Sequence, residues 1–223
     1  MSLTLSNSPL REVLVGISIN LTEEQLKTIE ESGIIERLYP IKRPVIGISF
    51  NQLNNSASQV LGGYNYISKD DKETILLDKT RITLSNRNKY KGFDSFIAPF
   101  IKILSGLSPI IGDFKQNTDI GLRYINEMIL TPAELKMFKI SLNDCNGIVD
   151  NYGAGFRINQ KDSFVNRAIQ KDLLQDESYR VIFDIDSHAK LTTDVVSTLN
   201  ALRKLKNNIF FDNIDESLIK KWE

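Results

Sequence analysis

The stretch Gly121–Leu130, which reads GLRYINEMIL, is the clearest guide to the architecture of this chain, because it passes without a linker into the start of a helix. Its residues favour a β-strand. Thr131, Pro132 and Glu134 then suit an N-cap, a first helical position and the third residue of a capping box. We therefore predict a strand followed directly by a helix, and we interpret the pair as the opening of the second half of the chain.

An equivalent order of signals occurs earlier. Residues Glu12–Ile19 repeat apolar side chains at a period of two, as a strand does. Thr22 and Gln25 then form a capping box, and Gly33 suits the left-handed residue that ends a helix. The repeated order predicts two copies of a strand–helix–strands–helix unit, which is an internal duplication.

The remaining elements follow from periodicity and from turn signals. The segments expected to be strands are Arg43–Phe50, Tyr64–Ser68, Glu73–Leu77, Arg81–Arg87, Ala154–Asn159 and Tyr179–Asp186, and those expected to be helices are Asp94–Ser105 and Thr193–Lys206. Residues Asn51–Gln59 suit a polar loop, and Pro99 should delay or kink its helix. The pattern predicts an α+β fold, with a largely antiparallel sheet and the long helices packed on one face. We expect a single compact domain, 1–223, made of the halves 1–112 and 113–223.

Composition excludes several classes of protein. The 223 residues include 28 Lys and Arg and 28 Asp and Glu, so no long-range field favours nucleic acid or an anionic membrane. With one cysteine, Cys145, and one histidine, His188, the chain can build neither an internal disulfide nor a Cys/His metal centre of its own. The N-terminus lacks a signal-peptide pattern, and we read no apolar run as long as a membrane span. We expect a cytoplasmic protein with no membrane contact and no cofactor.

The C-terminal tail carries an apolar series. Asp215 suits an N-cap, and the series comprises Phe210, Phe211, Ile214, Leu218 and Trp222. The pattern favours a terminal helix docked on the core over a helix that binds a partner, because large exposed apolar patches are rare.

Two acids and the histidine form one candidate site. Asp184, Asp186 and His188 alternate along the predicted strand and should project to one face. Two carboxylates and an imidazole could hold Mg²⁺ or Mn²⁺. The alternative is a solvated strand end whose acids pair with Arg180 or Arg123.

Arg123 and Asn126 form a second candidate site on an otherwise apolar strand. Arg123 could clamp a phosphate or carboxylate, with Asn126 as a further binding residue. We favour the alternative that Arg123 pairs with Asp184 or Asp186 across strands, because an unpaired buried charge is costly.

Aromatic and cationic residues of the first half form a third candidate surface. We predict that Tyr64, Tyr66, Arg81 and Arg87 share a wet sheet face, together with Thr83 and Lys89. Such a face could bind single-stranded nucleic acid by stacking and phosphate contacts. The alternative is ordinary cross-strand pairing within the sheet.

Catalytic motifs with established mechanisms are absent from the sequence. We find no phosphate-binding P-loop, no Gly-x-Ser-x-Gly elbow and no His-Glu-x-x-His helix. Gly153-Ala154-Gly155 lacks a dinucleotide-binding context, so we interpret it as a turn. No cation is clearly placed to activate the thiol of Cys145.

Several short motifs occur in the order seen in one protein family. They are Pro9–Leu14, Gly63-Tyr64, Tyr90–Phe93, Gly121–Asn126 and Phe183–Asp186, with Phe211 and Ile214 after the last long helix. On these motifs the chain resembles an uncharacterised, sporadically distributed bacterial family that is often found near mobile or defence genes. That family usually has Trp where this chain has Phe93. The resemblance implies no known reaction, cofactor or catalytic residue.

Three functions stay open at this stage. The first is a non-catalytic binding or assembly protein of a bacterial defence or mobile-element system, which engages a protein partner or its own copy through the sheet face or the terminal helix. The second is a nucleic-acid or nucleotide binder that uses the Tyr/Arg face. The third is a metal-dependent phosphodiesterase or nuclease centred on Asp184 and Asp186. The lack of a catalytic constellation favours the first.

Overall fold

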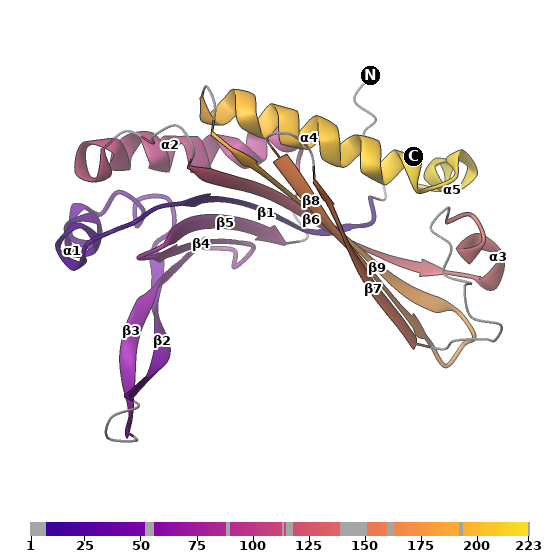
Figure 1. Cartoon of the computed structure of the whole chain (residues 1–223), viewed down its shortest axis with the longest axis horizontal. Helices are drawn as coiled ribbons and strands as arrows, with labels where there is room; N and C mark the ends of the chain where they lie inside the picture. The colour runs from indigo at the N-terminus through magenta and orange to yellow at the C-terminus, as the bar shows by residue number, and fades with distance from the viewer. Residues whose placement is uncertain are drawn as a thin grey trace. The chain divides into compact units, whose positions relative to one another are not determined.

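The computed structural model describes residues 8–51, 56–87, 90–112, 114, 118–138, 151–159, 163–191 and 194–222. Over these residues the chain forms an α+β fold with one nine-stranded antiparallel sheet and helices packed against it (Figure 1). The strand order is β2-β3-β4-β5-β1-β6-β9-β8-β7. The predicted α+β class, with an antiparallel sheet and helices packed against it, is therefore confirmed.

Two compact units divide the chain. The N-terminal unit comprises Leu14–Ile120 and Leu191–Val195, and the C-terminal unit comprises Met1–Val13, Gly121–Lys190 and Val196–Glu223. The predicted halves, 1–112 and 113–223, separate the chain close to the Ile120–Gly121 boundary. Each unit nevertheless includes a short segment from the far side of that boundary.

The N-terminal unit follows the order strand, helix, strands, helix. Its elements are most of β1 (Leu10–Ser18), α1 (Glu23–Ser32), β2 (Ile41–Asn51), β3 (Ser56–Ile67), β4 (Glu73–Asp78), β5 (Arg81–Arg87) and α2 (Phe93–Ile111). The β2–β3 hairpin extends beyond β4 and β5 (Figure 1). Within this unit Gly63 has a φ of 155°, and an added Cβ there would lie 2.2 Å from the carbonyl oxygen of Leu77. Glycine is therefore required at that point of the hairpin.

The C-terminal unit has a similar order of elements. It contains β6 (Asp119–Leu130), α3 (Pro132–Leu135), β7 (Asn151–Asn159), β8 (Ser163–Leu173), β9 (Tyr179–Lys190), α4 (Val195–Asp212) and α5 (Glu216–Lys220). In this unit β7 pairs antiparallel with β8, and β8 pairs antiparallel with β9. In Figure 1, α4 runs along one face of these strands.

Both predicted capping boxes are present. The hydroxyl of Thr22 accepts a hydrogen bond from the backbone N–H of Gln25 at 3.1 Å, and the side chain of Gln25 accepts one from the N–H of Thr22 at 3.0 Å. Thr131 and Glu134 exchange the same two bonds. The second helix is nevertheless only 4 residues long. It ends at Leu135, and three residues later Phe138 forms a β-bridge with Ile214.

Three predicted segments differ from the structure. Strand β8 was not predicted, because two of the residues on its helix-covered side are Arg167 and Lys171, which interrupt the apolar alternation. Strand β3 begins at Ser56, inside the segment expected to be a loop. Helix α2 continues to Ile111 with Pro99 inside it, because its apolar side chains pack into the core.

Helix α2 bears on the expectation that no apolar segment is as long as a membrane span. By length and composition alone, this helix of 19 residues could cross a membrane. The expectation that no apolar segment reaches this length is therefore wrong. Core helices of globular domains meet the same two criteria, and Phe100 and Ile103 of α2 are fully buried.

The core of the C-terminal unit lies between its strands and the terminal helices. Aromatic rings from both layers meet in it: Phe210 lies 6.2 Å from Phe183 and 6.4 Å from Trp222 between ring centroids. Ile214 and Leu218 belong to the same buried cluster. The terminal helix is therefore docked on the core, as predicted, and these apolar side chains are not available to a partner.

Candidate functional site

The candidate site lies on the face of the C-terminal strands that is turned away from the core. Along β9, residues from Val181 to Ser187 are buried at every second position. Arg180, Ile182, Asp184, Asp186 and His188 occupy the other positions and so share the opposite face. We call this second side the polar face.

Arg123 and Asp184 form a two-pronged ion pair across the polar face. Nε of Arg123 donates to Oδ1 and Oδ2 of Asp184 at 2.9 and 3.1 Å, and Nη2 donates to Oδ2 at 2.6 Å. The hydrogen bond to Asp184 raises the pKa of Arg123 above its ordinary value. The expected cross-strand pairing of Arg123 is thus present. Its guanidinium is bound to a carboxylate, which agrees with the structural role of Arg123.

Asn126 lies on the other side of the same strand. Its side chain is buried, and Nδ2 donates a hydrogen bond to the backbone carbonyl of Phe183 at 3.1 Å. Asn126 therefore links β6 to β9 on the core side and does not share a surface with Arg123.

Asp186 and His188 form a second pair near one end of the polar face. Oδ1 of Asp186 lies 2.9 Å from Nε2 of His188. The imidazole stacks on the ring of Phe164 with centroids 4.6 Å apart. Gly121 makes room for it, because a Cβ at that position would lie 3.0 Å from Nδ1 of His188.

A metal site is not assembled by these acids. Within the described ranges, no group of three or more His, Cys, Asp or Glu side chains is placed to hold a metal ion. The carboxylate of Asp184 is bound to Arg123, whereas that of Asp186 is bound to His188. The two acids therefore have separate partners, and we do not carry the metal hypothesis forward.

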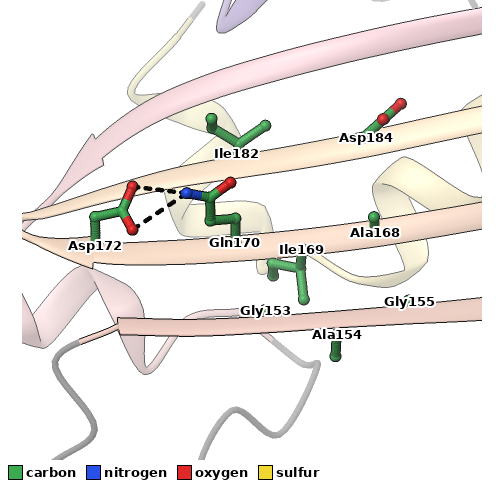
Figure 2. A pocket seen from close by; sticks show the side chains of 9 residues that line it. All are labelled: Gly153, Ala154, Gly155, Ala168, Ile169, Gln170, Asp172, Ile182 and Asp184. Atoms are coloured by element: carbon green, nitrogen blue, oxygen red, sulfur yellow. Dashed lines mark hydrogen bonds between the residues drawn. The ribbon is translucent and has the colours of Figure 1, made fainter.

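A shallow hollow lies beside Asp184 on the polar face. It has a volume of about 550 Å³, and its lining residues come from β7, β8 and β9: Gly153, Ala154, Gly155, Ala168, Ile169, Gln170, Asp172, Ile182 and Asp184 (Figure 2). The strand register places Gly155, Ala168 and Asp184 in one cross-strand row. The next row contains Gly153, Gln170 and Ile182.

The polarity of the hollow comes from its rim. Nε2 of Gln170 donates hydrogen bonds to both carboxylate oxygens of Asp172, at 3.1 and 3.2 Å (Figure 2). Asp184 is also at the rim, but Arg123 neutralises it. The two carboxylates therefore differ in their partners: Asp172 accepts these hydrogen bonds from an uncharged amide, whereas Asp184 is paired with a cation. A cationic group fits such a surface better than an anion does.

Two residues that line the hollow, Gly153 and Gly155, have no side chain, and we call them its glycine floor. A Cβ added at Gly153 or Gly155 would meet no atom of the described part of the chain within 4 Å. The structure places Gly153-Ala154-Gly155 inside strand β7, so the interpretation of this sequence as a turn is wrong. In the sequence, the pair Gly153 and Gly155 was the signal for the hollow. It could be interpreted only once these residues were known to lie in a strand.

The predicted Tyr/Arg face does not exist as one surface. Tyr64 pairs with Leu77, which in turn pairs with Ile82, so Tyr64 lies on the same side as the buried residues of β5. Tyr66 is 0% exposed. Because successive side chains of a strand alternate, Arg81 and Arg87 lie on the opposite side from Ile82.

The residues of that surface have other contacts. The ammonium of Lys42 lies 4.1 Å from the centroid of the Tyr64 ring, and Nε of Arg81 bonds Asp78 at 3.1 Å. Two further residues considered from the sequence, Lys89 and Cys145, lie outside the described residues.

One half-buried cation, Lys206, was not predicted from the sequence. The ammonium of Lys206, on α4, lies 3.7 Å from the centroid of the Tyr124 ring on β6. Burial, with a smaller contribution from the charge of Arg203, lowers the pKa of Lys206 to about 7. This pair lies on the core side of the unit and does not reach the hollow.

Comparison with known proteins adds no assignment: no protein-family model matches the chain, and no curated protein matches it. The resemblance drawn from short motifs therefore stays a prediction.

Proposed function

We propose that the chain is a non-catalytic binding and assembly protein, which engages a protein partner or its own copy through the hollow on the polar face. The observation that carries this proposal is a hollow of about 550 Å³ lined by Gly153 and Gly155, above which a Cβ would meet no described residue of the unit. Glycine inside a strand weakens it and often marks a place where a ligand or another backbone approaches closely.

The chemistry of the hollow supports a basic group as the preferred contact. Its rim contains Asp172, which is hydrogen-bonded to the neutral side chain of Gln170, and Asp184, which is neutralised by Arg123. An Arg or Lys side chain of a protein partner would reach a carboxylate there without displacing a cation. We therefore place the binding contact at Asp172 and the steric contact at the glycine floor.

The hollow can be blocked without disturbing the core. Ala168 is exposed in the middle of the hollow, so Ala168→Trp fills the space with an indole ring. Ala201 is exposed on α4 of the same unit, and Ala201→Trp is the matched control. Both variants should retain the circular dichroism spectrum and the unfolding midpoint of the unmodified chain.

The test is quantitative affinity capture from cells that naturally produce the chain, together with sedimentation of the purified protein. We expect a bound protein, or self-association, that persists with Ala201→Trp and falls at least tenfold with Ala168→Trp. The proposal fails if Ala168→Trp leaves the bound proteins and the sedimentation unchanged. It also fails if both tryptophan variants reduce binding equally.

We also infer that the two units arose by internal duplication. The inference is supported by the shared order of strand, short helix, strands and long helix, and by the capping boxes at Thr22 and Thr131. Homologous chains whose halves align with both capping boxes in register would support it. Halves that cannot be aligned in any homologue would contradict it. The bacterial defence or mobile-element setting likewise stays a prediction.

A further inference from the structure

Strand β7 forms one end of the sheet order, and it differs from the strand at the other end. In the part of the chain that the structure describes, β7 pairs with β8 alone. The opposite end strand, β2, contains Lys42, Arg43 and Pro44, the kinds of residue that discourage pairing with another chain. Strand β7 has no proline and a single charged residue, Arg157. Its free edge is therefore suited to pairing.

The glycines of β7 pack against none of the residues of their unit that the structure describes. Neither Gly153 nor Gly155 has a positive φ, and among the described residues no atom lies within 4 Å of a Cβ built on either. Both could be alanine without a clash, and alanine would favour the strand by about 0.5–1 kcal/mol at each position. The space above them is thus left open for something outside the unit.

The sequence of β7 is complementary to itself about Gly155. In an antiparallel pair of two copies centred on this residue, Ala154 faces Phe156, and Gly153 faces Arg157. At these four positions a large side chain therefore faces a small one. Phe156 is 46% exposed, and the second copy would cover it. Such a two-fold contact uses the same patch on both copies and closes on itself.

We propose that two copies of this chain associate through antiparallel pairing of β7 with β7, centred on Gly155, so that Arg157 of each copy enters the hollow of the other. The proposal rests on the proposed function, since it identifies the partner of the hollow as a second copy. It makes the binding site composite: the hollow supplies Asp172 and the glycine floor, whereas the second copy supplies the cation.

Reach and charge both agree with this arrangement. In the paired strands Arg157 of the second copy lies beside Gly153, and Gly153 lies beside Gln170, whose side chain bonds Asp172. Two strand spacings of about 4.8 Å separate the second copy's β7 from β8, and Asp172 lies two residues, about 6.8 Å, further along β8 than Gln170, so the Cα atoms of Arg157 and Asp172 would be roughly 12 Å apart. An extended Arg and an Asp side chain together span most of that distance. Arg157 already lies on the polar face, where its guanidinium carbon is 3.8 Å from the centroid of the Phe164 ring.

Disulfide trapping tests the pairing and its register. Residues directly opposite in an antiparallel pair have Cα atoms about 4.5–5.5 Å apart, within the range that a disulfide bridges. Gly155→Cys in a Cys145→Ser background should therefore form a dimer under mild oxidation. Gly153→Cys is the matched control, because its two copies would lie four residues, roughly 14 Å, apart.

Sedimentation of the full chain tests the forces involved. We expect a dimer of the 25.3 kDa chain. Gly155→Lys should raise its dissociation constant at least tenfold, because the substitution places two like charges at the two-fold centre. Ala201→Lys should leave the dimer intact. Arg157→Asp should weaken the dimer, and the exchange Arg157→Asp with Asp172→Arg should restore it.

The outcomes separate this inference from the proposed function. A chain that stays monomeric at high concentration, a dimer unaffected by Gly155→Lys, or equal trapping at Gly153 and Gly155 would each overturn the β7 pairing. Suppose that the chain is monomeric but captures another protein, and that Ala168→Trp abolishes this capture. The proposed function then stands, and the inference of β7 pairing is contradicted. If the dimer forms as described but Ala168→Trp leaves its dissociation constant unchanged, the hollow is not the binding contact.

Discussion

Replacing Lys206 by methionine should stabilise the protein, and the effect should depend on pH. The ammonium of Lys206 lies between α4 and β6 over the ring of Tyr124. Burial moves its pKa from 10.5 to about 7. At about 1.36 kcal/mol per pH unit, this difference corresponds to roughly 5 kcal/mol against the charged form. The attraction of a desolvated ammonium to an aromatic face returns about 2 kcal/mol, which leaves a net cost of about 3 kcal/mol.

The pH dependence follows from the direction of this change. Because the folded-state pKa lies below the unfolded-state value, the unfolded chain binds a proton between pH 7 and 10.5 that the folded protein excludes. The free energy of unfolding should therefore rise with pH through this window, and the full cost should apply below pH 7. Methionine has nearly the length of lysine and no charge, so Lys206→Met removes both the cost and the slope.

Urea unfolding from pH 6 to pH 10 measures both quantities. At pH 6 the variant should be about 3 kcal/mol more stable, equivalent to a rise of roughly 6–12 °C in the thermal midpoint. The difference should shrink toward pH 10. Lys204→Met, at an exposed position of the same helix, should change stability by less than about 0.5 kcal/mol. Parallel curves for the unmodified chain and Lys206→Met, or a loss of stability at pH 6, would refute the reasoning.

Three further substitutions test the fold and the ion pair. In a double-mutant cycle, Asp184→Asn and Arg123→Met should show a coupling free energy of about 1 kcal/mol or less, because the Arg123 side chain is 43% exposed; a coupling above 3 kcal/mol would mean that the pair is effectively buried. Phe210→Ala should cost about 3–5 kcal/mol in urea unfolding, since its ring is buried among other aromatic rings, and a cost below 1 kcal/mol would contradict the docking of the tail. Thr22→Ala should cost about 1 kcal/mol by loss of the N-cap, and Thr22→Ser, which keeps the cap, should restore most of it.

The sequence predicted the helix ends that depend on residues only a few positions apart. The capping boxes at Thr22 and Thr131 and the left-handed Gly33 each act within a few residues, so sequence alone located them. The length of α3 could not be predicted in this way. Three residues after its end, Phe138 meets Ile214, a contact between residues far apart in the chain.

The surfaces were harder to predict than the elements, because a face is defined by strand register. Tyr64 and Arg81 both belong to alternating strands, and only the pairing of β3 with β4 and of β4 with β5 shows that they face opposite ways. Arg123 was the exception. An Arg on an apolar strand must find a carboxylate, and that requirement identified Asp184 as one of two candidates before any register was known.

The contrast between the glycines of the two units supports the external role of β7. Gly63 is required by its own fold, since its φ is 155° and a Cβ would collide with the backbone of β4. Gly153 and Gly155 meet no such requirement, and together they weaken an end strand by about 1–2 kcal/mol relative to alanine. A side chain at either position would project into the hollow and narrow it. Gly153 and Gly155 thus lower the stability of the isolated unit, but they leave the space that a guanidinium from a second copy would occupy.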